Sequence, residues 1–160
     1  MQRIKKNLPW IAGALVLGFL LLQLANPAHT NPAVVHDLCA TDARPPSDHL
    51  VNLLHTACYD CHSYETRWPW YSHVMPISWQ VVDDVNEGRK HLNFSDWPVD
   101  NPARAAKKFS SMSEQLEYKE MPLAKYTLIH RDARLTDADR KALMDWADAE
   151  SARLRSATSK

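Results

Sequence analysis

Two cysteines and a histidine stand at a spacing that could hold a prosthetic group. The segment Cys58-Tyr59-Asp60-Cys61-His62 has the form C-x-x-C-H. Two thiols three positions apart can each add to a vinyl group of one porphyrin, and the histidine that follows can then reach the iron from the proximal side. The motif therefore predicts one haem c, bound covalently through both cysteines, with His62 as the proximal ligand.

Other functions of two close cysteines require partners that this sequence does not supply. A structural zinc site needs four ligands, yet the only further cysteine is Cys39, and Cys61 and His62 as adjacent ligands would crowd one tetrahedron. A thioredoxin-like dithiol should open a helix among alternating strands and helices, and strand-like alternation is almost absent here. Thiol oxidoreduction without haem stays open as an alternative.

Met121 is the candidate for the distal iron ligand. It stands in Glu120-Met121-Pro122, where the proline disfavours a helical conformation for the residue before it. A thioether in such a loop is the sixth ligand of His/Met c-type cytochromes, and this pairing raises the reduction potential relative to two histidines. The competing candidates are Met75, which also precedes a proline, and His73, His91 and His130.

Aromatic residues gather after the motif, and they could line a porphyrin and exclude water from it. They are Trp68, Trp70, Tyr71 and Trp79. Their indole N–H and phenol O–H groups could also bond a propionate. Arg67 and Arg89 could pair with the propionates, although solvated arginines and an ordinary aromatic core would explain the same residues.

Helical patterns are expected to position these residues. Ser47 is a good N-cap directly after two prolines, and the apolar stripe that follows leads at i+4 steps to the two cysteines. A second helix is expected over 76–88, with Gly88 as its breaker. Asn101-Pro102 should open a third helix, and Thr136 with Asp139 approximates the capping box of the last.

The fold class predicted from these patterns is all-α. The third helix repeats Ala105, Phe109, Met112 and Leu116 at helical spacing, which puts Met112 in the core rather than on the iron. We expect a cytochrome c-like helical domain around one covalently bound haem, preceded by a single N-terminal transmembrane helix.

The first 25 residues predict a membrane anchor. Arg3, Lys5 and Lys6 form a positive start, and residues 8–25 are uncharged and largely apolar, with Trp10 near the interface. As a helix this run measures about 27 Å, enough for the hydrocarbon core. The positive-inside rule then leaves the N-terminus in the cytoplasm and exports the rest to the periplasm. A cleavable signal sequence is the alternative, but it favours a shorter apolar stretch and small residues before the cut.

Three regions follow from composition: the anchor or signal sequence at 1–25, an extended proline-containing tether at 26–46, and the haem-binding domain at 47–156. The chain has 19 basic and 19 acidic residues, and the part beyond the anchor is mildly acidic because three of the basic residues lie in the anchor. This distribution gives no basis for nucleic-acid binding. A glycine-rich phosphate loop and a paired-carboxylate site are also absent from the sequence.

Taken together, the chain resembles the membrane-anchored haem-binding domain proteins of bacteria, which are small monohaem c-type cytochromes. The resemblance covers most of the chain and rests on the anchor and these segments: Asn31-Pro32, Cys58-Tyr59-Asp60-Cys61-His62-Ser63, Trp68-Pro69-Trp70-Tyr71, Pro76-Ile77-Ser78-Trp79, Glu87-Gly88-Arg89, Leu92-Asn93-Phe94-Ser95, Met121-Pro122, and Tyr126 to Trp146. It implies haem on Cys58 and Cys61, His62 as proximal ligand, Met121-Pro122 as distal loop, and Tyr126 among the cofactor contacts. The chain departs from the family in Leu123, where members often show a second proline, and in lacking a histidine before Val85.

These observations lead to a functional expectation. With His62 and Met121 saturating the iron, the protein should be a non-enzymatic electron carrier, held on the membrane with its haem domain in the periplasm. Redox partner proteins in the membrane or periplasm would exchange electrons with it, and the tether would let the domain swing between them. The alternative is haem-based catalysis of a peroxidase-like kind, or diatomic-gas sensing, at an open distal site.

Overall fold

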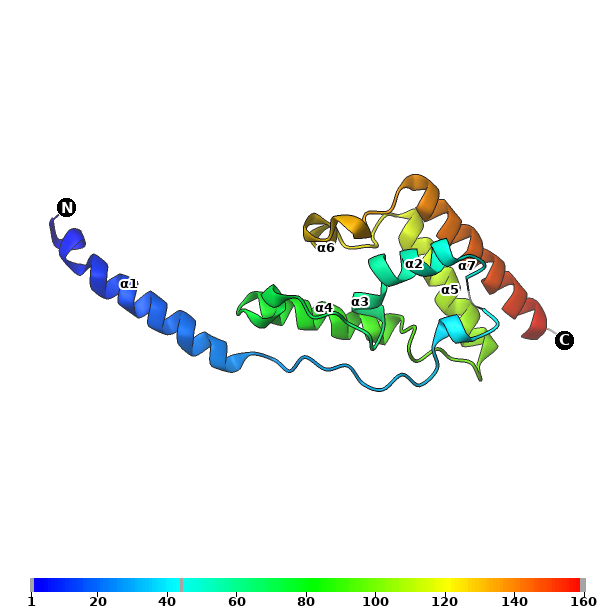
Figure 1. Cartoon of the computed structure of the whole chain (residues 1–160), viewed down its shortest axis with the longest axis horizontal. Coiled ribbons are helices and arrows are strands. Elements are labelled where there is room, and N and C mark those ends of the chain that lie inside the picture. The colour runs from blue at the N-terminus through cyan, green and yellow to red at the C-terminus, as the bar shows by residue number, and fades with distance from the viewer. Residues whose placement is uncertain (1, 44, 159–160) are drawn as a thin grey trace.

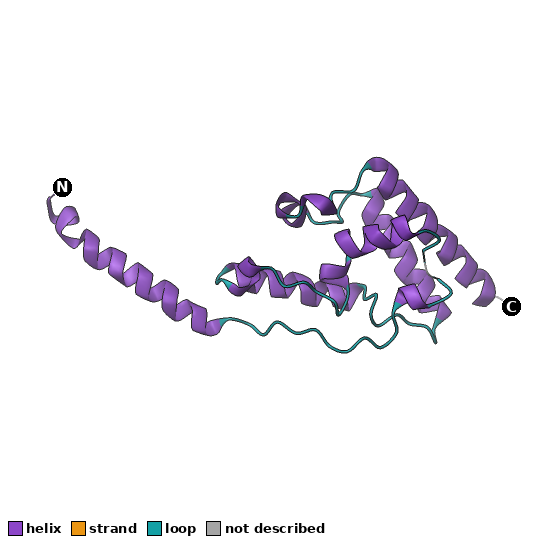
Figure 2. Cartoon of the chain, in the orientation of Figure 1, coloured by secondary structure: helices purple, strands orange, loops and turns teal. Residues whose placement is uncertain are grey.

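The computed structural model describes residues 2–43 and 45–158 and confirms the all-α fold. Within these residues the chain forms seven α-helices and four short 3-10 helices, without any β-strand (Figure 2). The nearest approach to a sheet there is an isolated bridge between His36 and Asp96. The side chains of Arg3, Lys5 and Lys6, on which the predicted orientation of the anchor depends, lie outside the described part.

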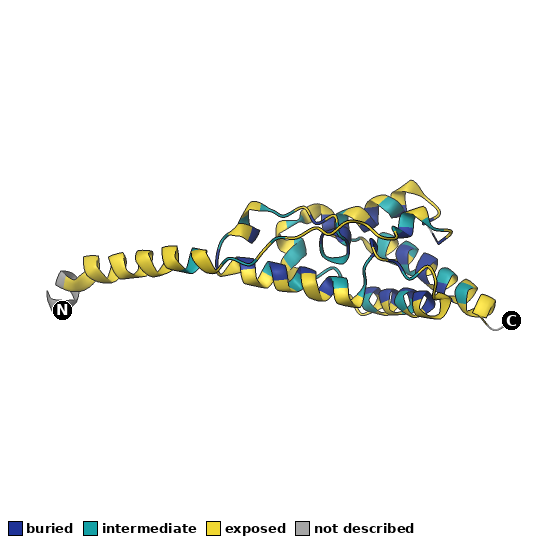
Figure 3. Ribbon diagram, turned by 90° about the horizontal axis from the view of Figure 1, so that it is seen from below, coloured by how far each residue is buried: buried dark blue, intermediate teal, exposed yellow. Residues whose placement is uncertain are grey.

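The N-terminal helix stands apart from the rest of the molecule. Helix α1 (Gln2–Leu22) continues into η1 (Gln23–Ala25) and extends away from the domain (Figure 1). The stretch Asn7–Ala25 has a mean hydropathy of 2.0, and none of it is buried against protein (Figure 3). Its length and composition suffice to cross a membrane, and a signal sequence would have the same properties.

The tether runs along the domain as an extended chain (Figure 1). The backbone N–H groups of Val35 and His36 donate to Ser95 O at 2.9 and 3.1 Å, and Leu38 N–H donates to Phe94 O at 2.8 Å. Leu38 opens the short helix η2 (Leu38–Ala40) and is fully buried. The tether is therefore hydrogen-bonded to the loop that follows α4.

The main core lies between α5 (Pro102–Glu117) and α7 (Asp137–Thr158), which pack along each other (Figure 1). Both N-termini are capped as predicted: Asn101 Oδ1 accepts from Arg104 N–H at 2.9 Å, and Thr136 Oγ1 accepts from Asp139 N–H at 3.1 Å. The predicted core stripe of α5 is buried, and it meets Leu143, Trp146 and Ala147 of α7.

The C-x-x-C-H motif lies where three helices meet. Helix α2 (Asp48–Ala57) begins after Ser47, whose Oγ accepts from Leu50 N–H at 3.3 Å, and the single-turn α3 (Tyr59–His62) follows directly. Helix α4 (Ile77–His91) crosses α3. The prediction that Gly88 ends this helix is wrong, because the helix continues through Gly88 to His91. A Cβ at Gly88 would lie 2.6 Å from Cys61 O, so this glycine is needed for the close approach of α3 and α4.

Three short helices complete the domain. The 3-10 helix η3 (Trp70–His73) precedes α4, while α6 (Ala124–Ile129) and η4 (Arg131–Ala133) link α5 to α7. None of the residues of α6 is buried. Tyr71 of η3 and His130 after α6 are joined side chain to side chain at 2.6 Å, and this contact ties the two loops together.

Candidate functional site

A cavity of about 800 Å³ opens beside the C-x-x-C-H motif. Its walls come from α3, α4, α5 and residues 121–126, and its volume lies in the roughly 300–1,000 Å³ range of cofactor pockets. The lining brings together five of the residues that the sequence nominated: Cys58, Cys61, His62, Met121 and Tyr126. Apolar side chains between them include Leu92, Phe94 and Leu116.

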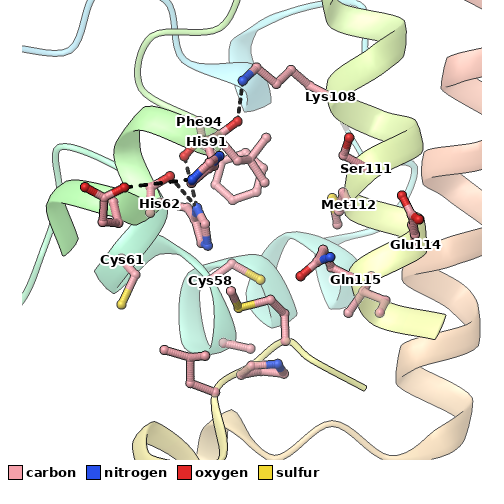
Figure 4. A pocket seen from close by; sticks show the side chains of 18 of the residues that line it. Cys58, Cys61, His62, His91, Phe94, Lys108, Ser111, Met112, Glu114 and Gln115 are labelled. Atoms are coloured by element: carbon pink, nitrogen blue, oxygen red, sulfur yellow. Dashed lines mark hydrogen bonds and ion pairs between the residues drawn. The ribbon is translucent and has the colours of Figure 1, made fainter. Parts of the chain in front are cut away.

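The imidazole of His62 is held in one orientation by backbone carbonyls. Its Nδ1 lies 2.9 Å from Gly88 O and 3.0 Å from Leu92 O (Figure 4). Because a carbonyl oxygen can only accept, Nδ1 carries the proton and Nε2 keeps its lone pair. Burial lowers the pKa of His62. The result is a neutral, fixed imidazole with one nitrogen free to bind a metal, which is the usual arrangement of a histidine ligand.

The two cysteines lie on the same turn as His62. Cys58 joins α2 to α3, and its carbonyl accepts from the N–H groups of Cys61 and His62 at 3.2 and 2.9 Å. Burial raises the pKa of each thiol to about 12. Cys61 adds to this effect at Cys58, and the carboxylates of Asp84 and Asp60 add to it at Cys61. A thiol redox centre needs a lowered pKa, so these surroundings disfavour the thioredoxin-like alternative.

A zinc site gains no support from the geometry either. Over residues 2–43 and 45–158, no cluster of three or more His, Cys, Asp or Glu side chains is arranged to hold a metal ion. The cavity brings the His62 nitrogen and the sulfur atoms of cysteine and methionine together around a large, mostly apolar space, with charged side chains of α4 and α5 also on the lining. That donor set suits a metal whose other ligands come from a macrocycle.

Met121 reaches the lining from the loop after α5. Arg140 Nη1, from α7, donates to Met121 O at 2.7 Å and to Leu116 O at 3.0 Å. Met121 N–H donates to Gln115 O at 3.3 Å. The backbone around Met121 is thus held by α5 and α7. The sequence did not reveal this role of Arg140, because it depends on two helices packing side by side.

A second methionine also lines the cavity. Met112 belongs to the core cluster, as the periodicity of α5 predicted, and it lies on the wall across from Cys58 and His62 (Figure 4). Among the competing ligands, His91 lies on the lining, where its side chain is 82% exposed and 3.8 Å from Glu87. Met75, His73 and His130 do not line it.

Asp60 is a site residue that the motif alone did not reveal. Its side chain is buried: Oδ1 accepts from the backbone N–H and Nε of Arg67, and Oδ2 accepts from Arg67 Nη2 at 3.1 Å. Oδ2 also accepts from the Tyr126 hydroxyl at 2.7 Å. Burial, reinforced by Asp60, raises the pKa of Tyr126, so the hydroxyl stays protonated and donates. This pair ties α6 to the motif.

The positive charge at the cavity comes from α5. Arg104, Lys107 and Lys108 lie on the lining, and Lys108 Nζ donates to His91 O (Figure 4). Burial lowers the pKa of Lys108, helped by the two neighbouring cations. Their spacing of i, i+3 and i+4 beside the core stripe is the sequence signal that places them on one face of the helix.

The two arginines proposed for the propionates are engaged elsewhere. Arg67 binds Asp60. Arg89 donates to Ser63 O, Thr30 O, Asn31 Oδ1 and Thr66 Oγ1 at 2.7 to 2.9 Å, which fastens the tether to the domain. Neither residue lines the cavity.

The aromatic cluster after the motif is not part of the lining. Trp70 and Trp79 are 79% and 50% exposed. The Tyr71 hydroxyl bonds to His130, and the Trp68 ring packs edge-on against His29 at 4.7 Å between centroids. Contact between these four residues and a porphyrin therefore stays a prediction, and the cavity itself is walled by other groups.

The sequence was also compared with known protein families, curated proteins and solved structures. A family model described as a haem-binding domain matches residues 17–149, which is most of the chain. Neither the curated proteins nor the solved structures contain a match to this sequence.

Proposed function

Because the chain belongs to the haem-binding domain family, we propose that its cavity holds one haem c, attached through Cys58 and Cys61 and ligated by His62. The observation that carries this proposal is the pair of carbonyls, Gly88 O and Leu92 O, that fix the His62 ring and leave Nε2 free on a cavity lining that also holds both cysteines. A proximal histidine needs such a partner to set its tautomer and orientation.

Met121 is the proposed distal ligand. Its loop contributes to the lining that also holds the motif, and the bonds to Arg140 and Gln115 hold its backbone in place. Arg104, Lys107 and Lys108 would bind the propionates, since charge-assisted bonds to carboxylates are strong. Phe94, Leu92 and Leu116 would exclude water from the cavity.

We further propose electron transfer as the function. When bound and ligated on both sides, haem supplies reversible one-electron chemistry. The residues of this chain supply the surroundings: the neutral His62 imidazole donates its lone pair, and Asp60 with Tyr126 holds α6 against the motif without moving a proton. Anchorage by α1 would place the domain in the periplasm beside redox partner proteins of the membrane.

One observation favours a second function, haem-based catalysis or gas sensing. Met121 is only partly buried, and no residue of the following helix α6 is buried, so this part of the lining is loosely packed. Such a segment can open at low cost. If Met121 leaves the iron, the distal side becomes accessible to small molecules.

Visible spectroscopy tests these proposals. The full-length protein, expressed with haem-maturation machinery, should retain haem on a denaturing gel, and a Cys58→Ala and Cys61→Ala double variant should lose it. The electron carrier should be low-spin in both oxidation states, show a sulfur-to-iron charge-transfer band when ferric, and not bind carbon monoxide when ferrous. A high-spin spectrum or rapid carbon monoxide binding would instead support catalysis or sensing.

A further inference from the structure

The segment 70–79, which comprises η3 and the start of α4, exposes large apolar side chains. Trp70 is 79% exposed, Trp79 is 50% exposed, and Ile77 between them is 49% exposed. Residues 70–79 contain no Asp, Glu, Lys or Arg. An uncharged segment that exposes two tryptophans is unusual on a water-facing surface, and such patches commonly mark an interaction site.

This same segment is hydrogen-bonded to the end of the membrane-length helix. Gln23 Oε1 accepts from Met75 N–H at 2.9 Å, and Gln23 Nε2 donates to Met75 O at 3.5 Å. Asn26 Nδ2 donates to His73 O at 2.6 Å, and Ser78 Oγ donates to Asn26 Oδ1. The side-chain amide of Gln23 thus bonds both the backbone N–H and the backbone C=O of Met75.

A further contact extends the attachment into the tether. The ring of His29 lies 4.1 Å from the ring of His73, and its Nε2 is 2.7 Å from Ser72 O. Residues 23–29 are therefore joined to residues 72–78 at several points. Figure 1 shows the result: the end of the domain formed by η3 and the start of α4 lies beside the end of α1.

The attachment determines how far from the bilayer this segment can be. The apolar run ends at Ala25, so in a membrane-spanning α1 the side chain of Gln23 reaches the bilayer surface. Met75, hydrogen-bonded to Gln23, must then lie at the same depth. Trp70, Ile77 and Trp79 flank this point, and tryptophan is enriched at the membrane–water interface, where its ring is buried and its N–H stays hydrated.

We propose that Trp70, Ile77 and Trp79 rest in the interfacial layer of the same bilayer that α1 spans, so that the domain is docked on the lipid surface. This inference depends on the proposed membrane anchorage. It also limits the height of the cavity above the membrane: Gly88, whose carbonyl holds His62, is eleven residues along α4 from Ile77, which is at most about 17 Å of helix. The proposed haem site would thus stay close to the membrane and to redox partners embedded in it.

Fluorine NMR on the full-length, haem-loaded protein tests the docking. The protein is labelled with 5-fluorotryptophan and placed in nanodiscs whose scaffold is a polymer rather than a protein, with or without doxyl-labelled lipid. The haem is kept ferric so that no reductant destroys the doxyl radical. Single Trp→Phe variants assign the six tryptophan signals. Docking predicts that Trp70 and Trp79 lose intensity when the labelled lipid is present. Trp97 and Trp146, which are 3% and 6% exposed in the core, should keep theirs.

Trp10 separates the two ways in which the experiment can fail. It lies within the apolar run of α1, so its signal must also lose intensity if the helix spans the bilayer. An unaffected Trp10 would overturn the anchorage and the docking with it. If the signal of Trp10 loses intensity while those of Trp70 and Trp79 do not, the docking alone is overturned. These two side chains would then be candidates for contact with a protein partner.

Discussion

At the scale of single residues, the identity of the distal ligand decides between electron transfer and chemistry at an open iron. Two thioethers line the cavity, one in a packed helix and one in a loop. Met112 is 7% exposed and contributes to the core, whereas Met121 is only partly buried and belongs to a segment without core contacts of its own. A side chain already committed to packing is a poor candidate for a bond that would pull it from the core, so the loop methionine is favoured.

Paired variants distinguish the two methionines. We expect Met121→Leu to abolish the sulfur-to-iron band and to let ferrous haem bind carbon monoxide, because leucine fills similar volume without a donor atom. Met112→Leu should keep the wild-type spectrum and lose at most about 1.5 kcal/mol of stability, as volume-conserving core changes do. Visible spectra with and without carbon monoxide check both. The reverse pattern would assign the ligand to Met112.

Arg140 affects the site through backbone bonds alone. Replacing it by methionine keeps the length of the side chain but removes the donors to Met121 O and Leu116 O. A hydrogen bond from a charged donor contributes about 1.5–3 kcal/mol, so the fraction of open distal sites should rise about tenfold or more. The carbon monoxide association rate of the ferrous protein measures that fraction. Lys141→Met, at an exposed neighbour bonded to Asp145, is the control, and equal rates in both variants would exclude a positioning role.

At the scale of elements, the crossing of α3 and α4 determines whether the site forms. The carbonyls of Gly88 and Leu92 hold His62 only while α4 lies directly against α3, and Gly88 permits that distance. Phe94 N–H also donates to His62 O at 2.7 Å, so the loop after α4 helps to close the contact. The imidazole is therefore oriented by one helix crossing rather than by its own turn.

Gly88→Ala tests this crossing. In a helix interior alanine is ordinarily better than glycine by roughly 1 kcal/mol. Here its Cβ would meet the backbone oxygen of Cys61 at 2.6 Å, and a backbone atom cannot rotate away. We expect the clash to exceed the propensity gain, with a net loss of about 1–2 kcal/mol in denaturant unfolding of the haem-loaded protein. Gly18→Ala in α1, with nothing within 4 Å, should not destabilise; a Gly88→Ala protein as stable as wild type would contradict the close packing.

The elements themselves could be predicted where the determinants are local. Ser47, Asn101 and the Thr136–Asp139 pair act within one helical turn, and all three caps form as the sequence indicates. The sequence pattern predicts that Gly88 ends its helix, and this prediction fails because the role of Gly88 depends on Cys61, which is distant in the chain. The contact of Asp60 with Tyr126 likewise depends on packing between distant segments, whereas the spacing of the basic residues of α5 is readable in the sequence itself.

At the scale of the whole molecule, the tether is more than a connection of a certain length. The sequence predicted an extended stretch between the anchor and the domain, and the structure adds its contacts: to residues 72–78 at one end, to Arg89 in the middle and to Ser95 further on. Proline content and polarity predict extension but not binding partners. A tether bonded along its length would keep the domain at a fixed height above the membrane.

Arg89 joins the middle of the tether to the domain. Its guanidinium joins Thr30 and Asn31 of the tether to Ser63 and Thr66 of the domain, and burial lowers its pKa without removing its charge near neutrality. Replacing Arg89 by methionine removes every one of these bonds while keeping an unbranched chain of similar length. The tether should then open more often, since each bond from a charged donor contributes about 1.5–3 kcal/mol.

Hydrogen exchange of the full-length protein in nanodiscs measures this opening. We expect the amides of Val35 and His36, which donate to Ser95 O, to exchange faster in Arg89→Met than in wild type, while the amides of α5 and α7 stay unchanged. Lys90→Met is the matched control, because Lys90 is exposed and pairs with Glu87 on its own helix. Equal exchange in the two variants would mean that the backbone bonds to Ser95 suffice. Faster exchange in Arg89→Met alone would mean that Arg89 holds this part of the tether on the domain.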